Sequence, residues 1–323
     1  MIITRTPFRM SFAGGGTDSP EFYRLDEGAI TGTTVNKYMY IMLNERFDSS
    51  IRVSYSKTEI AESVDEIQHP IVREAMKFTG VTSGVEIVSV ADVPAQTGLG
   101  SSSSFTVGLL NALYAYRGII KSPLELAEEA CHLEIDILGQ PIGKQDQYLA
   151  ACGNFCHITF GGSKGVLVEP IDTSISTRNE LENNLLLFYM GRTDAASVVL
   201  EEQQSKIEQN RELLKSITNL AVQSRDCLIS GSLGELGSLL HEGWELKKRL
   251  ANGITDRTID AWYEGARVLG ASGGKVLGAG GRGFLLLYCL PKYQRQVVEG
   301  LPELVRTQFA FDTKGTCIIY SGD

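Results

Sequence analysis

The segment best suited to chemistry is VPAQTGLGSSSSF, residues 93–105. It places Gly98, Gly100 and four consecutive serines in front of an apolar helical pattern. Backbone N–H groups at the start of a helix attract anions, and glycines let a phosphate come close to the backbone. A serine hydroxyl there could also bind Mg²⁺, which prefers oxygen ligands. The segment therefore predicts a phosphate site, and its alternative is a flexible strand–helix connection with a serine cap.

Two carboxylates follow in CHLEIDILGQPIGKQDQYL, residues 131–149. Glu134 falls in the last turns of a predicted helix, where its charge opposes the helix dipole. Asp146 falls in the first turn of the next short helix, where a negative charge is favourable. Both are candidates for the chemistry of a phosphate site. The alternatives are a solvated surface glutamate and an ordinary helix-start acid.

Two further glycine clusters accompany this segment, PFRMSFAGGGTD at residues 7–18 and GGKVLGAGGRG at residues 273–283. Each could be a tight turn, but three glycine loops in one chain favour a nucleotide and a substrate that meet in one cleft. The spacing excludes a Walker P-loop, because no Gly-Lys-Ser/Thr follows. It also excludes a dinucleotide fingerprint, because Ser103 replaces the third glycine. The motif set of protein kinases is missing as well.

These loops must be positioned by a strand-rich first part and a mixed second part. Ser122, Pro123 and Glu125 predict a capped helix that runs to about Leu138. The polar stretch 173–184 is a candidate domain boundary. Beyond it the patterns predict strands at 185–190, 274–277, 283–290 and 316–320, and helices at about 194–228, from 232 with a second capping box, at 256–269 and at 293–308. Merging consecutive helices gives β-α-β-β-α-β, the order of a ferredoxin-like unit.

The composition is that of an ordinary globular protein of two domains. The chain has 323 residues and a net charge of −9, which argues against binding to nucleic acid or to anionic membranes. No apolar run reaches the roughly 18 residues of a membrane helix. The six cysteines have no zinc spacing and no secretory signal precedes them, so we expect reduced thiols and a cytoplasmic protein.

Taken together, the three glycine motifs resemble those of the GHMP small-molecule kinases. The second motif, Pro-x-x-x-Gly-Leu-Gly-Ser-Ser, matches as PAQTGLGSS, and the third as VLGAGGRG. The first has Gly-Gly-Gly where galactokinases have Gly-Glu-His, and it resembles the branch that phosphorylates D-glycero-D-manno-heptose 7-phosphate at the anomeric hydroxyl. Fucokinase modules have a similar start. The alternatives are thus a kinase for an unphosphorylated sugar such as fucose, and a non-catalytic sugar sensor.

The resemblance implies an α+β fold of two domains. Residues 1–175 would form a ribosomal-protein-S5-domain-2-like domain that binds ATP, and residues 176–323 a ferredoxin-like domain. The implied partners are ATP with Mg²⁺ and a small phosphosugar. The oligomeric state stays open, with a homodimer as the one assembly considered.

The resemblance also implies roles for residues at matched positions. Asp146 would act as the base and Arg9 would lie near the transferred phosphate, while Ser102 and Glu134 would bind Mg²⁺. The implied ATP-binding residues are Pro94, Gly98, Leu99, Gly100, Ser101, Ser102 and Ser103. The implied substrate-binding residues are Gly15, Gly16, Thr17, Asp18, Arg192, Gly280 and Arg282. A phosphosugar needs an anion site of its own, for which the basic candidates are Lys144, Arg192, Lys275 and Arg282.

Overall fold

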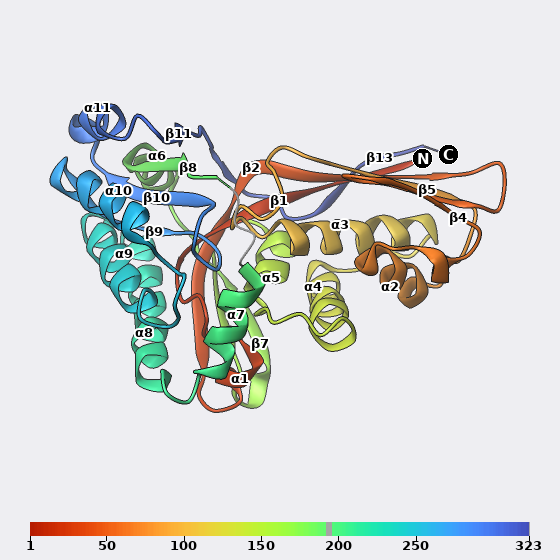
Figure 1. The fold of residues 1–323 in the computed structure, drawn as a ribbon, viewed down its shortest axis with the longest axis horizontal. Coiled ribbons are helices and arrows are strands. Elements are labelled where there is room, and N and C mark those ends of the chain that lie inside the picture. Colours follow the sequence, from red (N-terminus) through yellow and green to blue (C-terminus); the bar gives the residue numbers. More distant parts are fainter. Residues whose placement is uncertain (192–195, 323) are drawn as a thin grey trace.

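The computed structural model describes residues 1–191 and 196–322, which form two β-sheets at opposite ends of the long axis of the molecule (Figure 1). The first sheet has the strand order β13-β1-β2-β5-β3-β4, with β6 and β12 also paired to β2 and β7 paired to β6. Its strands are β1 (Ile2–Ala13), β2 (Gly28–Glu45), β3 (Ile51–Ser54), β4 (Thr58–Ala61), β5 (Val85–Ala91), β6 (Cys156–Phe160), β7 (Val166–Pro170), β12 (Phe311–Asp312) and β13 (Cys317–Ser321).

The long hairpin of β1 and β2 is the backbone of this first unit. The first part of β2 pairs with β6 and its last part with β5, so one strand joins two regions of the sheet. Helices α2 to α5 lie along one face of the sheet (Figure 1). The helical segments of this unit are α1 (Pro20–Tyr23), η1 (Val64–Glu66), α2 (Pro70–Thr79), α3 (Ser101–Tyr116), α4 (Pro123–Cys131), the π-helix η2 (His132–Ile137), α5 (Gln145–Cys152) and η3 (Gly162–Lys164).

Local sequence signals explain the helices that carry candidate residues. The capping box predicted for α4 is confirmed, because Ser122 and Glu125 exchange their two hydrogen bonds. The helix predicted to reach about Leu138 does so, but its last part is the π-helix η2, which holds Glu134. Single π-helical turns are rare in proteins overall, but those that occur are often found at functional sites. The predicted start of α3 at the serine run is also confirmed.

The second sheet has the antiparallel order β11-β8-β10-β9, which is the ferredoxin-like arrangement that the sequence predicted. The helices that connect its strands in sequence lie against this second sheet (Figure 1). The elements are α6 (Ile175–Asn184), β8 (Leu185–Tyr189), α7 (Ala196–Ser205), α8 (Arg211–Ser230), α9 (Leu233–Lys247), α10 (Arg257–Val268), β9 (Ala271–Val276), β10 (Phe284–Cys289), α11 (Pro291–Gly300) and β11 (Val305–Arg306).

Three details of the second unit differ from the prediction. The fourth strand of the unit is the short β11, whereas the strand predicted at 316–320 is β13, which pairs with β1 and completes the first sheet. The polar stretch 173–184, predicted only as a candidate domain boundary, contains the helix α6, which is capped by the side chain of Ser174. The second capping box is missing, because Ser232 makes no side-chain cap bond.

The return of the chain to the first sheet bears on the predicted division at residue 175. The strands β12 and β13 belong to the first sheet, although they lie beyond the second unit in sequence. β13 pairs with the first residues of β1, which would otherwise be a free sheet edge. The boundary near residue 175 stays a prediction, with the last residues of the chain added to the first unit.

The two units pack closely through α8, which lies against β1 and β2. The Thr31 hydroxyl of β2 donates a hydrogen bond to the Ala221 carbonyl of α8 at 2.7 Å. Ala13, Ala29, Leu220 and Ala221 form a small buried apolar cluster at the same place. In the described part of the chain, every helix is too short or too polar to cross a membrane.

Candidate active site

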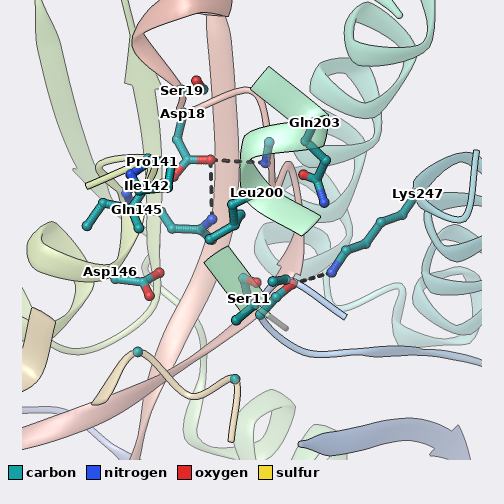
Figure 2. A pocket seen from close by; sticks show the side chains of 18 of the residues that line it. Ser11, Asp18, Ser19, Pro141, Ile142, Gln145, Asp146, Leu200, Gln203 and Lys247 are labelled. Carbon is teal, nitrogen blue, oxygen red and sulfur yellow. Dashed lines mark hydrogen bonds between the residues drawn. The ribbon is translucent and has the colours of Figure 1, made fainter. Parts of the chain in front are cut away.

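A cavity of about 260 Å³ lies between the two units and collects most of the predicted site residues (Figure 2). The first unit contributes the end of β1, the loop after it, the glycine segment before α3 and the start of α5. The second unit contributes α7, α8, the end of α9 and the segment around β9. The site is therefore a shared cleft, to which neither unit contributes every wall.

Arg9 joins the glycine loop to the predicted base. Its Nε and Nη2 donate to the two carboxylate oxygens of Asp146 at 2.7 and 2.8 Å, which is the bidentate geometry of a strong ion pair. Its Nη1 donates to the Gly98 carbonyl, and its backbone N–H donates to the Leu99 carbonyl at 3.1 Å. The guanidinium is only 4% exposed. Arg9 thus fixes the orientation of Asp146 relative to the start of α3.

Glu134 is fully buried, which excludes the alternative of a solvated surface glutamate. Its Oε1 accepts a hydrogen bond from the Ser102 hydroxyl at 2.7 Å, and its Oε2 accepts one from the Gln147 amide at 2.7 Å. Burial raises the pKa of the Glu134 carboxyl above its usual value, and the two hydrogen bonds oppose this. A buried carboxylate held against an exposed serine hydroxyl presents two oxygen donors of the type that Mg²⁺ prefers.

Asp18 is held by the loop that precedes α5. Its carboxylate accepts hydrogen bonds from the backbone N–H groups of Gly16 and Gln145, both at 3.0 Å, and from the Gln145 amide at 3.2 Å (Figure 2). Burial raises the pKa of Asp18, and the nearby charge of Asp146 adds to the effect. Gly143 leaves room for this carboxylate, because a Cβ there would clash with it.

The glycines of the second and third motifs interlock. A Cβ on Gly98 would clash with the Leu277 carbonyl, and a Cβ on Gly283 would clash with the Thr97 carbonyl. A Cβ on Gly278 would lie 2.5 Å from the Gly98 Cα. The third glycine loop therefore packs directly on the predicted phosphate loop and supports its shape.

The structure brings most predicted residues to the cavity but not all of them. Those that line it are Arg9, Gly15, Gly16, Asp18, Gly98, Gly100, Ser101, Ser102, Ser103 and Asp146. Glu134 lies behind Ser102 and reaches the cavity only through that hydroxyl. Leu99 places its side chain in the hydrophobic core, and Pro94 is exposed outside the lining.

Three predicted substrate residues, Thr17, Gly280 and Arg282, are not part of the cavity lining. The Thr17 hydroxyl donates to the Gly14 carbonyl at 2.7 Å and is fully buried, so it does not face the cavity. Gly280 packs against Ile254 and is not part of the lining. Arg282 forms an ion pair with Asp256 at 2.6 Å, and this pair holds it outside the lining. The roles of these three residues in substrate binding stay predictions, and Arg192 lies outside the described residues.

Sequence analysis did not identify Lys247 as a cation of the cavity, and it could not select Lys275 from the other basic candidates. Lys247, at the end of α9, lines the cavity with Lys275 of β9, which was one of four basic candidates. Lys247 follows Leu240 and Trp244 on the buried stripe of α9. A lysine on an apolar stripe is unusual. This position was the signal that could have identified it.

The described residues contain no group of three or more His, Cys, Asp or Glu side chains that could hold a metal ion. This does not conflict with a nucleotide-bound Mg²⁺, since that ion usually takes only one or two protein oxygens and fills its shell with water and phosphate. The Ser102 hydroxyl and the Glu134 carboxylate fit that donor set. The conclusion rests on their oxygen chemistry and on the burial of Glu134.

Comparison with known proteins agrees with this arrangement. Residues 61–154 match the model of the GHMP kinases N terminal domain, and residues 224–306 match that of the GHMP kinases C terminal domain. The chain is 28% identical over 314 residues to the D-glycero-alpha-D-manno-heptose 7-phosphate kinase of Campylobacter jejuni. The match covers 93% of this chain and 93% of that protein. It is 25% identical over 323 residues to the L-fucokinase/L-fucose-1-P guanylyltransferase of Bacteroides fragilis, where the match covers 88% of this chain and 34% of that protein.

Among solved structures, a D-glycero-D-manno-heptose 1-phosphate kinase from Bacteroides thetaiotaomicron superposes with a TM-score of 0.82 at 26% identity. The match covers 99% of this chain and 100% of that chain, so it includes both units and their relative placement. The two family models fall on the two units in the expected order. The chain therefore belongs to the GHMP kinase family and is an ATP-dependent kinase.

Proposed function

We propose that this kinase transfers the γ-phosphoryl group of ATP to the anomeric hydroxyl of D-glycero-D-manno-heptose 7-phosphate and so produces the 1,7-bisphosphate. The observation that carries the proposal is the meeting of Asp18, Asp146 and the glycine loop in one cavity. Carboxylates accept hydrogen bonds from sugar hydroxyls, and the backbone N–H groups of a glycine loop at a helix start bind phosphates. The cavity thus has the parts that a sugar and a nucleotide require.

The relatives support a sugar that already carries a phosphate. The names of the Campylobacter jejuni and Bacteroides thetaiotaomicron proteins both specify a heptose phosphate, although they differ in the position of that phosphate. The fucokinase match favours a second candidate function, phosphorylation of an unphosphorylated sugar such as fucose. The two candidates differ in one chemical requirement, which is a second anion site for the acceptor.

Asp146 is the proposed base. The reaction spreads charge over the oxygens of the transferred group, so catalysis depends mainly on placement and charge compensation. The ion pair with Arg9 aims the Asp146 carboxylate into the cavity beside the start of α3. An anomeric hydroxyl is more acidic than an ordinary alcohol, so Asp146 needs only to orient it and accept its proton. Arg9 positions Asp146 and adds positive charge beside the glycine loop.

Ser102 and Glu134 are the proposed protein ligands of the nucleotide-bound Mg²⁺, which would neutralise phosphate charge. Gln147 holds the second oxygen of Glu134 and so orients the first one toward Ser102. The unpaired N–H groups at the start of α3 would hold the phosphates of ATP. Asp18, fixed by three hydrogen bonds, would accept hydrogen bonds from sugar hydroxyls.

A coupled assay of ADP release tests the proposal. The acceptors are heptose 7-phosphate, heptose 1-phosphate, mannose, fucose and galactose, and ³¹P NMR identifies the position of the new phosphate. Turnover that requires the 7-phosphate and yields an anomeric phosphate supports the proposal. Equal or better turnover of fucose supports the second candidate. ATP binding without turnover of any acceptor would indicate a non-catalytic sugar sensor.

A further inference from the structure

Two of the lysine side chains that line the cavity are buried. Lys247 is 8% exposed and Lys275 is 6% exposed, and both line the cavity. They come from α9 and β9 of the second unit, and Lys247 enters from the side opposite Asp146 (Figure 2). Both also line a small space behind it, next to Phe12 and Gly14. The two side chains therefore reach the same region from neighbouring elements.

Neither ammonium has a carboxylate partner among the described residues. Lys247 donates to the backbone carbonyls of Val276, at 3.1 Å, and of Gly278. Lys275 makes one long hydrogen bond, 3.3 Å, to the Phe12 carbonyl. A buried cation without a counter-ion costs free energy, and proteins normally pair such a charge or place it at the surface. Two such groups close together are stable in the charged form when an anion is bound, and without one burial favours the neutral amines.

The charges around the pair strengthen this point. Burial lowers the pKa of both lysines, and the neighbouring charge of Arg9 lowers each of them further. The carboxylates that face the pair are Asp18 and Asp146, and Arg9 already binds both oxygens of Asp146. Since Arg9 is paired with Asp146, the charged form of the two lysines has no ion-pair partner among the described residues, and a phosphate that binds there would supply one.

We propose that Lys247 and Lys275 form an anion subsite that binds the phosphate already present on the acceptor sugar. This inference rests on the proposed function, since it assigns that phosphate a place in the same cavity. The nucleotide phosphates have their own site at the glycine loop, with Arg9, Ser102 and the start of α3 on the first unit. Lys247, on the second unit, enters the cavity from the side opposite the proposed base Asp146, and we place the far end of the acceptor on that side (Figure 2).

The experiment compares the variants Lys247→Met and Lys275→Met with the matched control Lys248→Met. Lys248 is the next residue after Lys247 and forms an ion pair with Glu245 at 2.6 Å, away from the cavity lining. Kinetics are measured with heptose 7-phosphate and with the same heptose without its phosphate. We expect each cavity variant to raise the KM for the phosphorylated sugar by roughly 10- to 100-fold, the scale of one lost charged hydrogen bond. The KM for the unphosphorylated sugar and for ATP should change by less than about threefold, and the control should match the wild type.

A second measurement is independent of turnover. The binding of inorganic phosphate is measured by calorimetry in the presence of saturating MgADP, which fills the nucleotide site. We expect phosphate binding by the wild type and the control, and its loss in both cavity variants. Met has a similar volume to Lys and lacks the buried charge, so thermal unfolding should show that the variants are folded.

The outcomes separate the two proposals. If the wild type turns over heptose 7-phosphate but the cavity variants keep its KM and still bind phosphate, the anion subsite is refuted and the proposed function stands. If no heptose phosphate is a substrate, but the variants lose phosphate binding, the proposed function fails and the subsite stands. A KM change that is equal for both sugars, or that falls on ATP alone, also refutes the subsite.

Discussion

Replacement of Lys275 by methionine should stabilise the ligand-free protein at neutral pH and make its stability less dependent on pH. Lys275 is 6% exposed, and among the described residues its side chain makes one long hydrogen bond, to the Phe12 carbonyl. Burial, with the nearby charge of Arg9, lowers the pKa of Lys275 from its usual 10.5 to about 7. Methionine fills a similar volume without a charge, so the variant avoids the desolvation cost.

The size of the effect follows from proton linkage. The pKa of this lysine is lower in the folded state, so the unfolded state binds more protons between the two pKa values. The stability of the wild type therefore rises with pH across that window. With a pKa of about 7 in the folded state and 10.5 in the unfolded state, the gain between pH 7 and pH 9 is about 2 kcal/mol. The variant lacks this contribution, so its advantage over the wild type should shrink by about the same amount.

The assay is urea unfolding at pH 7, 8 and 9 without ligands, followed by the fluorescence of the buried Trp244 in α9. The difference in unfolding free energy between variant and wild type is taken at equal m values. The Lys248→Met control removes a half-buried charge that is paired with Glu245, and its difference from the wild type should not change with pH. Parallel curves for the Lys275→Met variant and the wild type would refute the reasoning, because Lys275 would then carry the same charge in both states.

Three further predictions concern the first unit. The Asp146→Asn variant should lose turnover by on the order of 10² or more, and near-normal turnover would remove its role as base. The Glu134→Gln variant should need more Mg²⁺ for half-maximal activity, and an unchanged Mg²⁺ titration would rule out ligation. The Gly98→Ala variant has a φ of +79° and a clash with Leu277, so it should lose more than about 1 kcal/mol of stability and raise the KM for ATP. Gly118→Ala, with a φ of +70° and open space, pays only for its backbone conformation and should keep that KM.

Much of the second unit could be predicted from the sequence because its signals are local. Apolar spacing predicted the order β-α-β-β-α-β, and the observed order agrees with it apart from the identity of the last strand. The last strand was assigned to the wrong sheet, because a strand pattern does not specify its partner. β1 lies at the start of the chain and β13 near its end, so the whole second unit lies between them in sequence. Only the assembled fold decides such a long-range pairing.

The candidate site was predictable where residue type and local structure coincide. The glycines and serines at the start of α3 fall in this class. The pairing of Arg9 with Asp146 joins residues far apart in the chain, so spacing did not predict it. Arg282 had the right residue type in the right motif, but its partner Asp256 holds it outside the cavity. Charge type alone therefore did not tell a ligand-facing cation from a paired one.

If the acceptor is the proposed phosphosugar, the buried lysines would also explain how an acidic protein attracts two anionic substrates. A net charge of −9 repels ATP and a phosphosugar at long range, so attraction must come from the cleft itself. Charges in a low-dielectric cleft act more strongly on a bound ligand than exposed charges, which water and salt screen. Burial of Arg9, Lys247 and Lys275 concentrates positive charge in this way. Because burial lowers the pKa of both lysines, the free protein reduces the cost by releasing protons, and an arriving dianion restores them. Under the proposed function, the same burial that destabilises the empty cleft would make it selective for an acceptor with a phosphate.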